Sequence, residues 1–444
     1  MTHLNRIYEP AAYGPQGACF WADTVPAHDW PSLPADLTAD VAIIGGGFTG
    51  LSAALHLAQA GIAPVVLEAQ RSGWGASGRN GGFCCLGGAK ASDAQLAARF
   101  GRDAPLLWHQ TERRAVETVD ALITDFGMQV DRHSQGETQL AHTAKAWDQM
   151  RQQAESVARA YNVTPQLIES ADLPAHEMGG AWHGAMTIPL GFALNPRKYH
   201  SGLAKAALGA GAKLFAQSPV QKIDRLNKGW VLATPRGRVT ARKVILATNG
   251  YSSENLPDWL RGRYLPVQSS VIVTRPLSKE EQAAQGWTTA QMAYDSRKLL
   301  HYFRLMPDGR FLFGMRGGLR ATPAAQAAIA RRIRSDFAAM FPAWRNIEIT
   351  HEWSGLVCLT ASLTPFVGAV PDHPGLYAGL GFHGNGVAMG TEAGRILSAL
   401  VMGQDPEVPA MPGILAQPPR RFPLGRHRRA LLAPAYWMAE TFDL

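Results

Sequence analysis

The stretch Asp40-Val-Ala-Ile-Ile-Gly-Gly-Gly-Phe-Thr-Gly-Leu-Ser-Ala-Ala-Leu55, followed by Val65-Val-Leu-Glu68, decides the fold. An apolar run predicts a buried parallel strand, and Gly45, Gly47 and Gly50 follow it with G-x-G-x-x-G spacing. A helical pattern and a second apolar strand come next. Such glycines bring the backbone close to a pyrophosphate at a helix N-terminus, and the acidic residue that ends the second strand is placed to bind a ribose. The stretch therefore predicts a dinucleotide site.

A second glycine-rich segment, Gly73-Trp-Gly-Ala-Ser-Gly-Arg-Asn-Gly-Gly82, follows at once. Its glycines let the main chain pass closely over a large ligand. Ser77, Arg79 and Asn80 offer hydrogen-bond donors to a phosphate or to a flavin ring. A solvent-exposed loop is the alternative interpretation.

Two later segments favour FAD over NAD as the dinucleotide. Residues 244–251 read as another buried strand that ends in a turn, and residues 379–390 form a glycine-rich entry to a helix. A helix N-terminus at 386–391 places its positive end beside the flavin carbonyls, where it stabilises a reduced, anionic ring.

The motifs together resemble a known family. Gly75-Ala-Ser-Gly-Arg-Asn-Gly-Gly82, Leu246-Ala-Thr-Asn-Gly250 and Gly381-Phe-His-Gly-Asn-Gly386 are similar to motifs of the D-amino-acid-oxidase-like FAD superfamily, nearest to its γ-glutamylputrescine oxidase branch. The similarity extends from about residue 8 to the C-terminus. It implies a flavin domain, a substrate domain, and oxidation of a C–N bond by hydride transfer to flavin N5, which gives an imine that hydrolyses.

We expect FAD, bound without a covalent link, to contact residues from all of these segments. They are Gly45, Gly47, Phe48, Thr49, Gly50, Glu68, Ala69, Gly75, Ala76, Ser77, Arg79, Asn80, Gly81, Gly82, Val220, Thr248, Asn249, Gly250, Gly381, Gly384, Asn385, Gly386 and Val387.

The candidate catalytic residues are Tyr302 and Arg316, on a predicted hairpin, and His383, in the late glycine loop. Arg316, with Arg304 on the same hairpin, is a candidate clamp for a substrate carboxylate, because a guanidinium offers two parallel donors. The alternative for Arg316 is a surface position on the strand, and the alternative for Tyr302 is packing within the sheet. The alternative for His383 is a hydrogen-bonded structural role.

Departures from the sarcosine-oxidase pattern bear on the substrate and the electron acceptor. By this resemblance, Ala388 stands where a lysine follows the late loop, and Leu312 where a lysine promotes reaction with oxygen. The first departure leads us to expect a longer, carboxylate-bearing amine. The second leaves the choice between an oxidase and a dehydrogenase open, and oxygen is the acceptor that we expect. A dehydrogenase that passes electrons to a quinone or another carrier, a sarcosine-oxidase-like N-demethylating enzyme, and a non-catalytic or tRNA-modifying flavoprotein remain alternatives. Cys358 is the candidate for a covalent flavin link.

The predicted fold class is α/β, with an FAD-binding Rossmann-type (glutathione-reductase-like) domain and a second, α+β substrate domain on an antiparallel sheet. We expect an N-terminal extension at 1–36, a discontinuous FAD domain at 37–92, 168–256 and 352–412, a substrate domain at 93–167 and 257–351, and a basic arm at 413–444. In the substrate domain, helices are expected over 106–126, 144–161 and 323–341, and strands over 136–142, 265–274, 299–305 and 311–316. Alternation in these strands predicts a sheet with one face over the flavin.

Composition restricts the remaining function classes. The chain has 444 residues, 46% hydrophobic content and a formal net charge of +8. The excess of positive charge is scattered, apart from Arg420, Arg421, Arg426, Arg428 and Arg429, so we expect no nucleic-acid partner. No apolar run is long enough to cross a membrane, and no metal-ligand spacing is present. Four cysteines without a paired pattern indicate a cytoplasmic enzyme, with Cys84 and Cys85 expected as buried packing residues.

Overall fold

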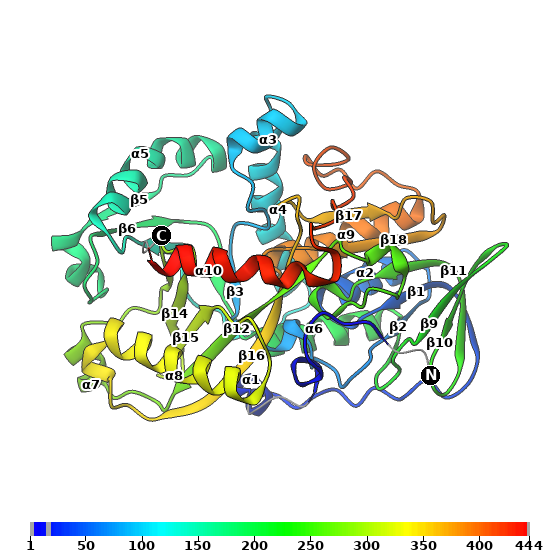
Figure 1. Ribbon diagram of the computed structural model, residues 1–444, viewed down its shortest axis with the longest axis horizontal. Helices are drawn as coiled ribbons and strands as arrows, with labels where there is room; N and C mark the ends of the chain where they lie inside the picture. The colour runs from blue at the N-terminus through cyan, green and yellow to red at the C-terminus, as the bar shows by residue number, and fades with distance from the viewer. Residues whose placement is uncertain (1–3, 15–18, 442–444) are drawn as a thin grey trace.

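A computed structural model describes residues 4–14 and 19–441 and contains two large sheets (Figure 1). Each large sheet has eight strands, and β3 (Phe83–Cys84) and β7 (Phe192–Ala193) form a small third sheet. The α-helices of the described residues are α1 (Phe20–Thr24), α2 (Phe48–Gln59), α3 (Asp93–Phe100), α4 (Ala104–Asp125), α5 (Ala144–Tyr161), α6 (Pro196–Gly209), α7 (Lys279–Gln285), α8 (Pro323–Met340), α9 (Ala388–Met402) and α10 (Leu432–Thr441).

The first sheet has the order β17-β18-β11-β1-β2-β8, and β10 and β9 extend it from β11. From β18 to β8 its strands are parallel. Helices α2, α6 and α9 pack together, and α9 also packs on β18. The strands are β1 (Leu37–Ile44), β2 (Pro64–Leu67), β8 (Lys213–Phe215), β9 (Lys222–Leu226), β10 (Gly229–Ala233), β11 (Arg238–Leu246), β17 (Phe366–Ala369) and β18 (Leu376–Leu380). This parallel α/β unit confirms the predicted Rossmann-type fold.

The second sheet has the order β16-β12-β15-β14-β13-β4-β6-β5. Its pairs are antiparallel except for β13 with β4. The strands are β4 (Glu137–Leu140), β5 (Gln166–Glu169), β6 (Gly184–Ile188), β12 (Leu265–Thr274), β13 (Met292–Asp295), β14 (His301–Leu305), β15 (Phe311–Arg316) and β16 (Ile349–Leu359). The α+β character of this part therefore agrees with the expectation, with one parallel pair inside the sheet.

The strands of this sheet depart from simple alternation because both of their faces are covered. Phe303, Phe311 and Phe313 pack with Phe337 and Phe341, which belong to α8 and the residue after it. On the opposite face, the residues that alternate with these pack against the N-terminal segment; they include Val271, Val273 and Leu312, with Phe20 and Trp21. A strand that is buried on both faces has no polar face to alternate.

Three strands belong to the second sheet, although the expected domain bounds place them wholly or partly in the FAD domain. β5 and β6 fall within or across the 168–256 segment and β16 begins just before residue 352, yet all three pair in the second sheet. The strands of the second sheet thus extend into segments that the expected bounds give to the FAD domain. The domain bounds themselves stay a prediction.

Both ends of the described chain are held against the body. Trp21 donates a hydrogen bond from Nε1 to the carbonyl of Asn80 over 2.8 Å. In the expected basic arm, buried Arg428 pairs with Glu254 at 2.7 Å, and Arg429 pairs with Glu9 at 2.7 Å. Helix α10 crosses in front of the middle of the molecule (Figure 1). Two of the five arginines of the arm are therefore used in internal ion pairs.

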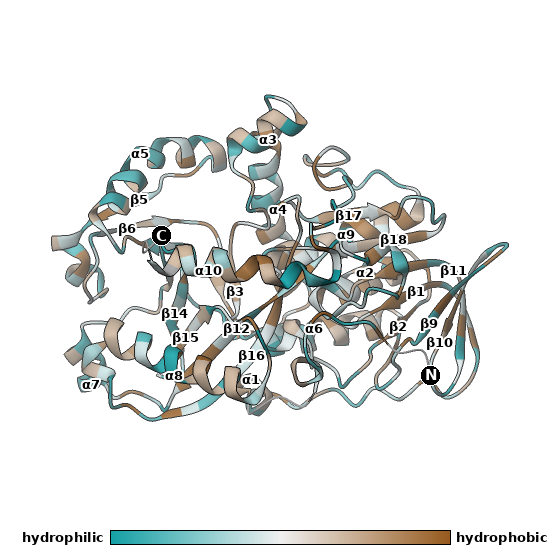
Figure 2. Cartoon of the chain, in the orientation of Figure 1, coloured by the Kyte–Doolittle hydropathy of each residue, from teal (hydrophilic) through white to brown (hydrophobic). Residues whose placement is uncertain are grey.

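The distribution of hydrophobic residues follows the arrangement of the sheets and helices. Hydrophobic residues concentrate in the strands of the first sheet and in α2 and α9, whereas α5 is largely hydrophilic (Figure 2). Within residues 4–14 and 19–441, no helix combines the length and the apolar character that a membrane crossing needs. The same residues contain no cluster of three or more His, Cys, Asp or Glu side chains that could hold a metal ion.

Candidate functional site

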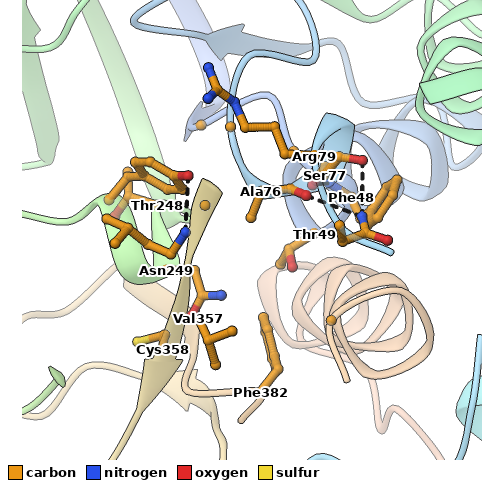
Figure 3. Close-up of a pocket in the computed structure, with 18 of the residues that line it drawn as sticks. Phe48, Thr49, Ala76, Ser77, Arg79, Thr248, Asn249, Val357, Cys358 and Phe382 are labelled. Carbon is orange, nitrogen blue, oxygen red and sulfur yellow. Dashed lines mark hydrogen bonds between the residues drawn. The ribbon is translucent and has the colours of Figure 1, made fainter. Parts of the chain in front are cut away.

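A cavity of about 390 Å³ is lined by residues of both large sheets. Figure 3 shows part of its wall: Thr248 and Asn249 lie on one side, Phe48, Thr49, Ala76 and Ser77 on the other, and Val357, Cys358 and Phe382 lie below them. The turn after β1, the 73–81 loop, the turn after β11 and the 384–387 loop all contribute to it. The cavity thus collects the segments that the sequence pointed to separately.

The glycines of the β1–α2 turn allow close backbone packing. Gly45 has φ +107°, and a Cβ atom there would lie 2.7 Å from the carbonyl oxygen of Ala247. A Cβ atom at Gly50 would lie 2.0 Å from the carbonyl oxygen of Gly45. Gly47 lines the cavity, and its Cβ position lies 2.8 Å from Ser77 Oγ. Gly45 and Gly50 are therefore needed for the fold, while Gly47 leaves room at the cavity wall.

Glu68 and His200 hold the turn from opposite sides of Gly46. The N–H of Gly46 donates to Glu68 Oε2 over 2.9 Å, and His200 Nε2 lies 2.7 Å from the carbonyl oxygen of Gly46. Burial lowers the pKa of His200 to about 4, so the neutral ring donates this hydrogen bond. Burial also raises the pKa of Glu68, against the hydrogen bonds from nearby amides. Glu68 lines the cavity, and because each of its oxygens accepts one backbone hydrogen bond, the carboxylate keeps lone pairs that a ribose site requires.

The 73–82 loop is braced by its own polar residues. Ser77 Oγ accepts a hydrogen bond from the N–H of Phe48 over 2.9 Å, which joins η2 (Ala76–Gly78) to α2. Asn80 Nδ2 donates to the carbonyl of Ala76 over 3.1 Å, and Asn80 Oδ1 accepts from the N–H of Gly82 over 2.8 Å. The guanidinium of Arg79 lies 4.6 Å from the centre of a ring of Trp74. These side chains line the cavity and also fix the loop that surrounds it.

The late glycine loop connects β18 to α9 and is tied to other segments. Asn249 Oδ1 accepts from the N–H of Gly381 over 3.0 Å, and Arg316 Nη2 donates to the carbonyl of His383 over 3.3 Å. Asn385 Nδ2 donates to the carbonyl of Leu86. The N-terminus of α9 therefore faces the cavity beside both Arg316 and the 85–90 segment.

Most of the expected cofactor residues line the cavity. They are Gly45, Gly47, Phe48, Thr49, Glu68, Ala69, Gly75, Ala76, Ser77, Arg79, Asn80, Gly81, Val220, Thr248, Asn249, Gly384, Asn385, Gly386 and Val387. Gly50, Gly82, Gly250 and Gly381 do not line it. These four glycines pack against neighbouring backbone or side chains instead; a Cβ atom at Gly82, for example, would lie 2.0 Å from the carbonyl oxygen of Leu194. Direct cofactor contact at the four is an expectation that this geometry does not support.

His383 lies behind the cavity wall. It is fully buried; Nδ1 lies 2.8 Å from the carbonyl oxygen of Gly88, and Nε2 accepts from the N–H of Thr360 over 3.2 Å. Burial lowers the pKa of His383 to about 4, so the ring is neutral and both nitrogens are engaged. The candidate catalytic role therefore has no geometric support, and the residue braces the late loop.

Arg304, the second candidate for the carboxylate clamp, is also a buried structural residue. Its side chain is fully buried and donates to the carbonyl oxygens of Leu194 over 2.8 Å and Gly82 over 3.3 Å. It does not line the cavity. Arg304 shares a face of β14 with Tyr302, but the N-terminal segment covers that face at Arg304, whose guanidinium carbon lies 5.5 Å from the centre of a ring of Trp21.

Of the candidate catalytic residues, Tyr302 and Arg316 line the cavity. The hydroxyl of Tyr302 lies 3.1 Å from Ser269 Oγ. Lys90, which no motif singled out, also lines the cavity, and no carboxylate of the described residues forms an ion pair with Lys90 or Arg316. Two cations without a counter-ion in the described part of the chain would attract an anionic group.

Glu137 and Tyr294 are further lining residues that the sequence reading missed. Tyr294 O–H donates to Glu137 Oε1 over 2.9 Å, and the N–H of Leu86 donates to Glu137 Oε2 over 2.8 Å. The available signal was weak. The predicted strand over 136–142 contains Glu137, but the sequence alone does not show that this ionisable side chain is buried, which is rare for a glutamate.

Comparisons with known proteins agree with this architecture. A family model described as "FAD dependent oxidoreductase" (DAO) matches residues 40–400. The chain belongs to this family. It is 31% identical over 389 residues to "Probable oxidoreductase OrdL" of Haemophilus influenzae, a match that covers 87% of this chain and 88% of the relative. It is 30% identical over 398 residues to "Gamma-glutamylputrescine oxidoreductase" of Escherichia coli, covering 90% and 91%.

A solved structure has the same fold as this family member. The crystal structure of glycine oxidase from Geobacillus kaustophilus superposes with a TM-score of 0.70 at 22% identity, covering 85% of this chain and 98% of that one. The chain is thus an FAD-dependent oxidoreductase with a D-amino-acid-oxidase-like fold. The braced glycine turn, the Glu68 carboxylate and the cavity fit FAD, and Glu68 and the 384–387 loop are among the residues that would hold it.

Proposed function

We propose that this enzyme oxidises the C–N bond of an amine that also carries a carboxylate. The observation that carries the proposal is the position of Arg316 and Lys90, two cations that line the FAD cavity without an ion-pair partner among the described residues. A substrate carboxylate would compensate their charge. Bound FAD supplies the acceptor for the hydride that leaves the carbon next to nitrogen.

The positions of the charged residues in the cavity bear on the substrate class. Because Arg316 comes from β15 and Lys90 from the segment after β3, the anionic group of the substrate is held by two separate segments of the cavity wall. Ala388, at the start of α9, offers no charged group there. We propose a longer amine of the γ-glutamylputrescine kind, as the name of the Escherichia coli relative suggests, and not a small N-methyl amino acid.

Oxygen is the proposed electron acceptor, and the imine product hydrolyses to an aldehyde or keto compound. A dehydrogenase that uses a quinone or another carrier is the second candidate. The use of Arg428 and Arg429 in internal ion pairs leaves a smaller basic surface for that candidate than the arm suggests. None of the four cysteines, all of which lie in the described residues, forms a disulfide, which suits a reaction in the cytoplasm.

The test is reduction of the purified yellow protein without oxygen. Carboxylate-bearing amines should bleach the flavin absorbance faster than plain alkylamines of equal length, and air should restore the colour within the assay. Bleaching without recovery in air would favour the dehydrogenase. A flavin that no amine or amino acid reduces would overturn the proposed function.

A further inference from the structure

Glu137 is a buried carboxylate that the proposed reaction has not yet used. It is the first residue of β4, which lies between β13 and β6, and the residue is 4% exposed and lines the cavity. The O–H of Tyr294 and the N–H of Leu86 each donate to one of its oxygens, at 2.9 and 2.8 Å. No lysine, arginine or histidine of the described chain forms an ion pair with it.

The pKa of Glu137 reflects its burial and its lack of an ion-pair partner among the described residues. Burial raises the pKa of Glu137 to about 7, although the two hydrogen bonds oppose that change. The titratable groups whose charges act on Glu137 or on its partner Tyr294 come from several elements. They are Tyr294 on β13, Cys84, Cys85 and Lys90 around β3, Glu112 on α4, and Tyr161 on α5. Only Lys90 among them is a base, and the structure records no ion pair between the described side chains of Lys90 and Glu137.

We propose that Glu137 binds the ammonium group of the substrate and accepts a proton from it, with Tyr294 as its positioning residue. The inference rests on the proposed function, since it requires that the substrate be an amine. A bound ammonium group would provide the cation that this carboxylate lacks within the protein. The aromatic rings of Tyr294 and Tyr302, both at the cavity wall, add a surface that attracts cations.

The charges of the cavity then match a substrate that carries both signs. Glu137 takes the amine, while Lys90 and Arg316 take the carboxylate. In the proton step an N–H bond breaks, the proton goes to a carboxylate oxygen of Glu137, and the electron pair stays on nitrogen. That lone pair then assists departure of the hydride from the adjacent carbon, which an ammonium nitrogen cannot do.

The test uses the holoenzyme and ligands that cannot be oxidised. In 4-amino-4-methylpentanoate the carbon next to nitrogen bears no hydrogen, and 4,4-dimethylpentanoate has the same shape without the amine. Dissociation constants come from the change in flavin absorbance and from calorimetry, so the readout is binding and not turnover. We expect the wild type to prefer the amino compound, and this preference to grow from about pH 6 to about pH 8 as Glu137 ionises.

Glu137→Gln should weaken binding of the amino compound by about tenfold or more and leave the dimethyl compound within about twofold, which is the contrast expected on loss of a charged hydrogen bond. The pH dependence of the preference should disappear in the same variant. Glu137→Asp should recover part of the preference. Tyr294→Phe should move the midpoint to higher pH, because it removes a hydrogen bond that favours the carboxylate. Glu155→Gln, on the exposed face of α5, is the matched control.

The outcomes distinguish failure of the role proposed for Glu137 from failure of the proposed function. Unchanged selectivity in Glu137→Gln, or equal weakening of both ligands in both Glu137 variants, would overturn the role of Glu137. If oxidisable amines still bleach the wild-type flavin in that case, the proposed function stands without it. Flavin content and circular dichroism identify any variant that misfolds, and Tyr294→Phe then supplies the decision through the pH midpoint.

Discussion

Arg316 donates from Nη2 to the carbonyl oxygen of His383 over 3.3 Å, and this contact joins strand β15 to the loop before α9. The substrate-facing sheet and the late flavin loop are therefore linked through the same guanidinium that lines the cavity. A Cβ atom at Gly384 would lie 2.4 Å from Arg316 Nη2, so the loop is shaped around this side chain. Arg316 consequently has a structural contact in addition to its proposed contact with substrate.

Replacement of Arg316 tests the carboxylate site. Arg316→Ala should raise KM for carboxylate-bearing amines by a factor that corresponds to about 2–4 kcal/mol, and change plain alkylamines much less. Arg316→Lys should recover only part of the loss, because an ammonium group cannot make two parallel hydrogen bonds. Steady-state kinetics on matched pairs of amines measure both effects.

The control for this series is Arg334→Ala, which removes an arginine of α8 that pairs with Glu352 away from the cavity. It should leave both classes of amine unchanged. An equal loss for charged and uncharged amines in Arg316→Ala would assign the residue to the loop contact with His383 alone. Faster turnover of sarcosine than of any longer amine would contradict the substrate class.

Gly47→Val tests the dinucleotide site. Its Cβ position lies 2.8 Å from Ser77 Oγ at the cavity wall, so a valine would crowd the pyrophosphate path and the Ser77 contact with Phe48. We expect colourless protein that remains folded, as absorbance at flavin wavelengths and circular dichroism would show. Gly209→Ala, with open space around its Cβ position at the end of α6, is the control and should stay yellow. A yellow Gly47→Val protein would contradict the assignment.

Local patterns predicted the parts of the molecule whose geometry is set by nearby residues. The β1–α2 turn, α5 at Ala144–Tyr161 and β12 at Leu265–Thr274 form as expected, because spacing, capping and apolar periodicity act over a few residues. The packing on the two faces of the second sheet was not predictable in this way. Arg304 lies on the same face of the sheet as Tyr302, but Trp21, distant in sequence, covers that face at Arg304, and the strand pattern alone could not reveal this.

The substrate end of the site escaped the sequence reading for the same reason. Lys90, Glu137 and Tyr294 come from three segments that share no motif, and the fold alone brings them to one cavity. By contrast, the flavin residues lie in glycine-rich turns, where the backbone requirement itself leaves a pattern in the sequence. Catalytic contacts made by single side chains on regular strands leave no such pattern.

Cys358 offers a test of how the flavin is held. The thiol lies at the cavity wall, and burial raises its pKa to about 12, so it is protonated and a poor nucleophile at neutral pH. We therefore predict that acid precipitation of the wild type releases intact FAD into the supernatant. Cys358→Ala should keep the flavin content of the wild type. Flavin that stays with the denatured wild-type chain and is lost in Cys358→Ala would show a covalent link.

Lys90 should make anion binding depend on pH. Lys90 is exposed as a whole residue, but partial desolvation of its ammonium group at the cavity wall, followed by the charge of Arg316, lowers the pKa of Lys90 to about 8. Its ammonium form therefore prevails below about pH 8, and the positive charge is lost as the pH rises through that value. The affinity of the wild type for 4,4-dimethylpentanoate, which has no amine to titrate, should fall over this range by about fivefold, or ~1 kcal/mol.

Two substitutions separate this effect from a general response of the protein to pH. Lys90→Met should bind the same carboxylate weakly at all pH values near neutrality, while Lys90→Arg should bind it well and lose the fall near pH 8, because a guanidinium stays charged there. Lys205→Met, an exposed position on α6, should behave as the wild type. Calorimetric titration at several pH values measures all four proteins. A fall near pH 8 that persists in Lys90→Arg would mean that another group titrates, and would remove Lys90 from the carboxylate site.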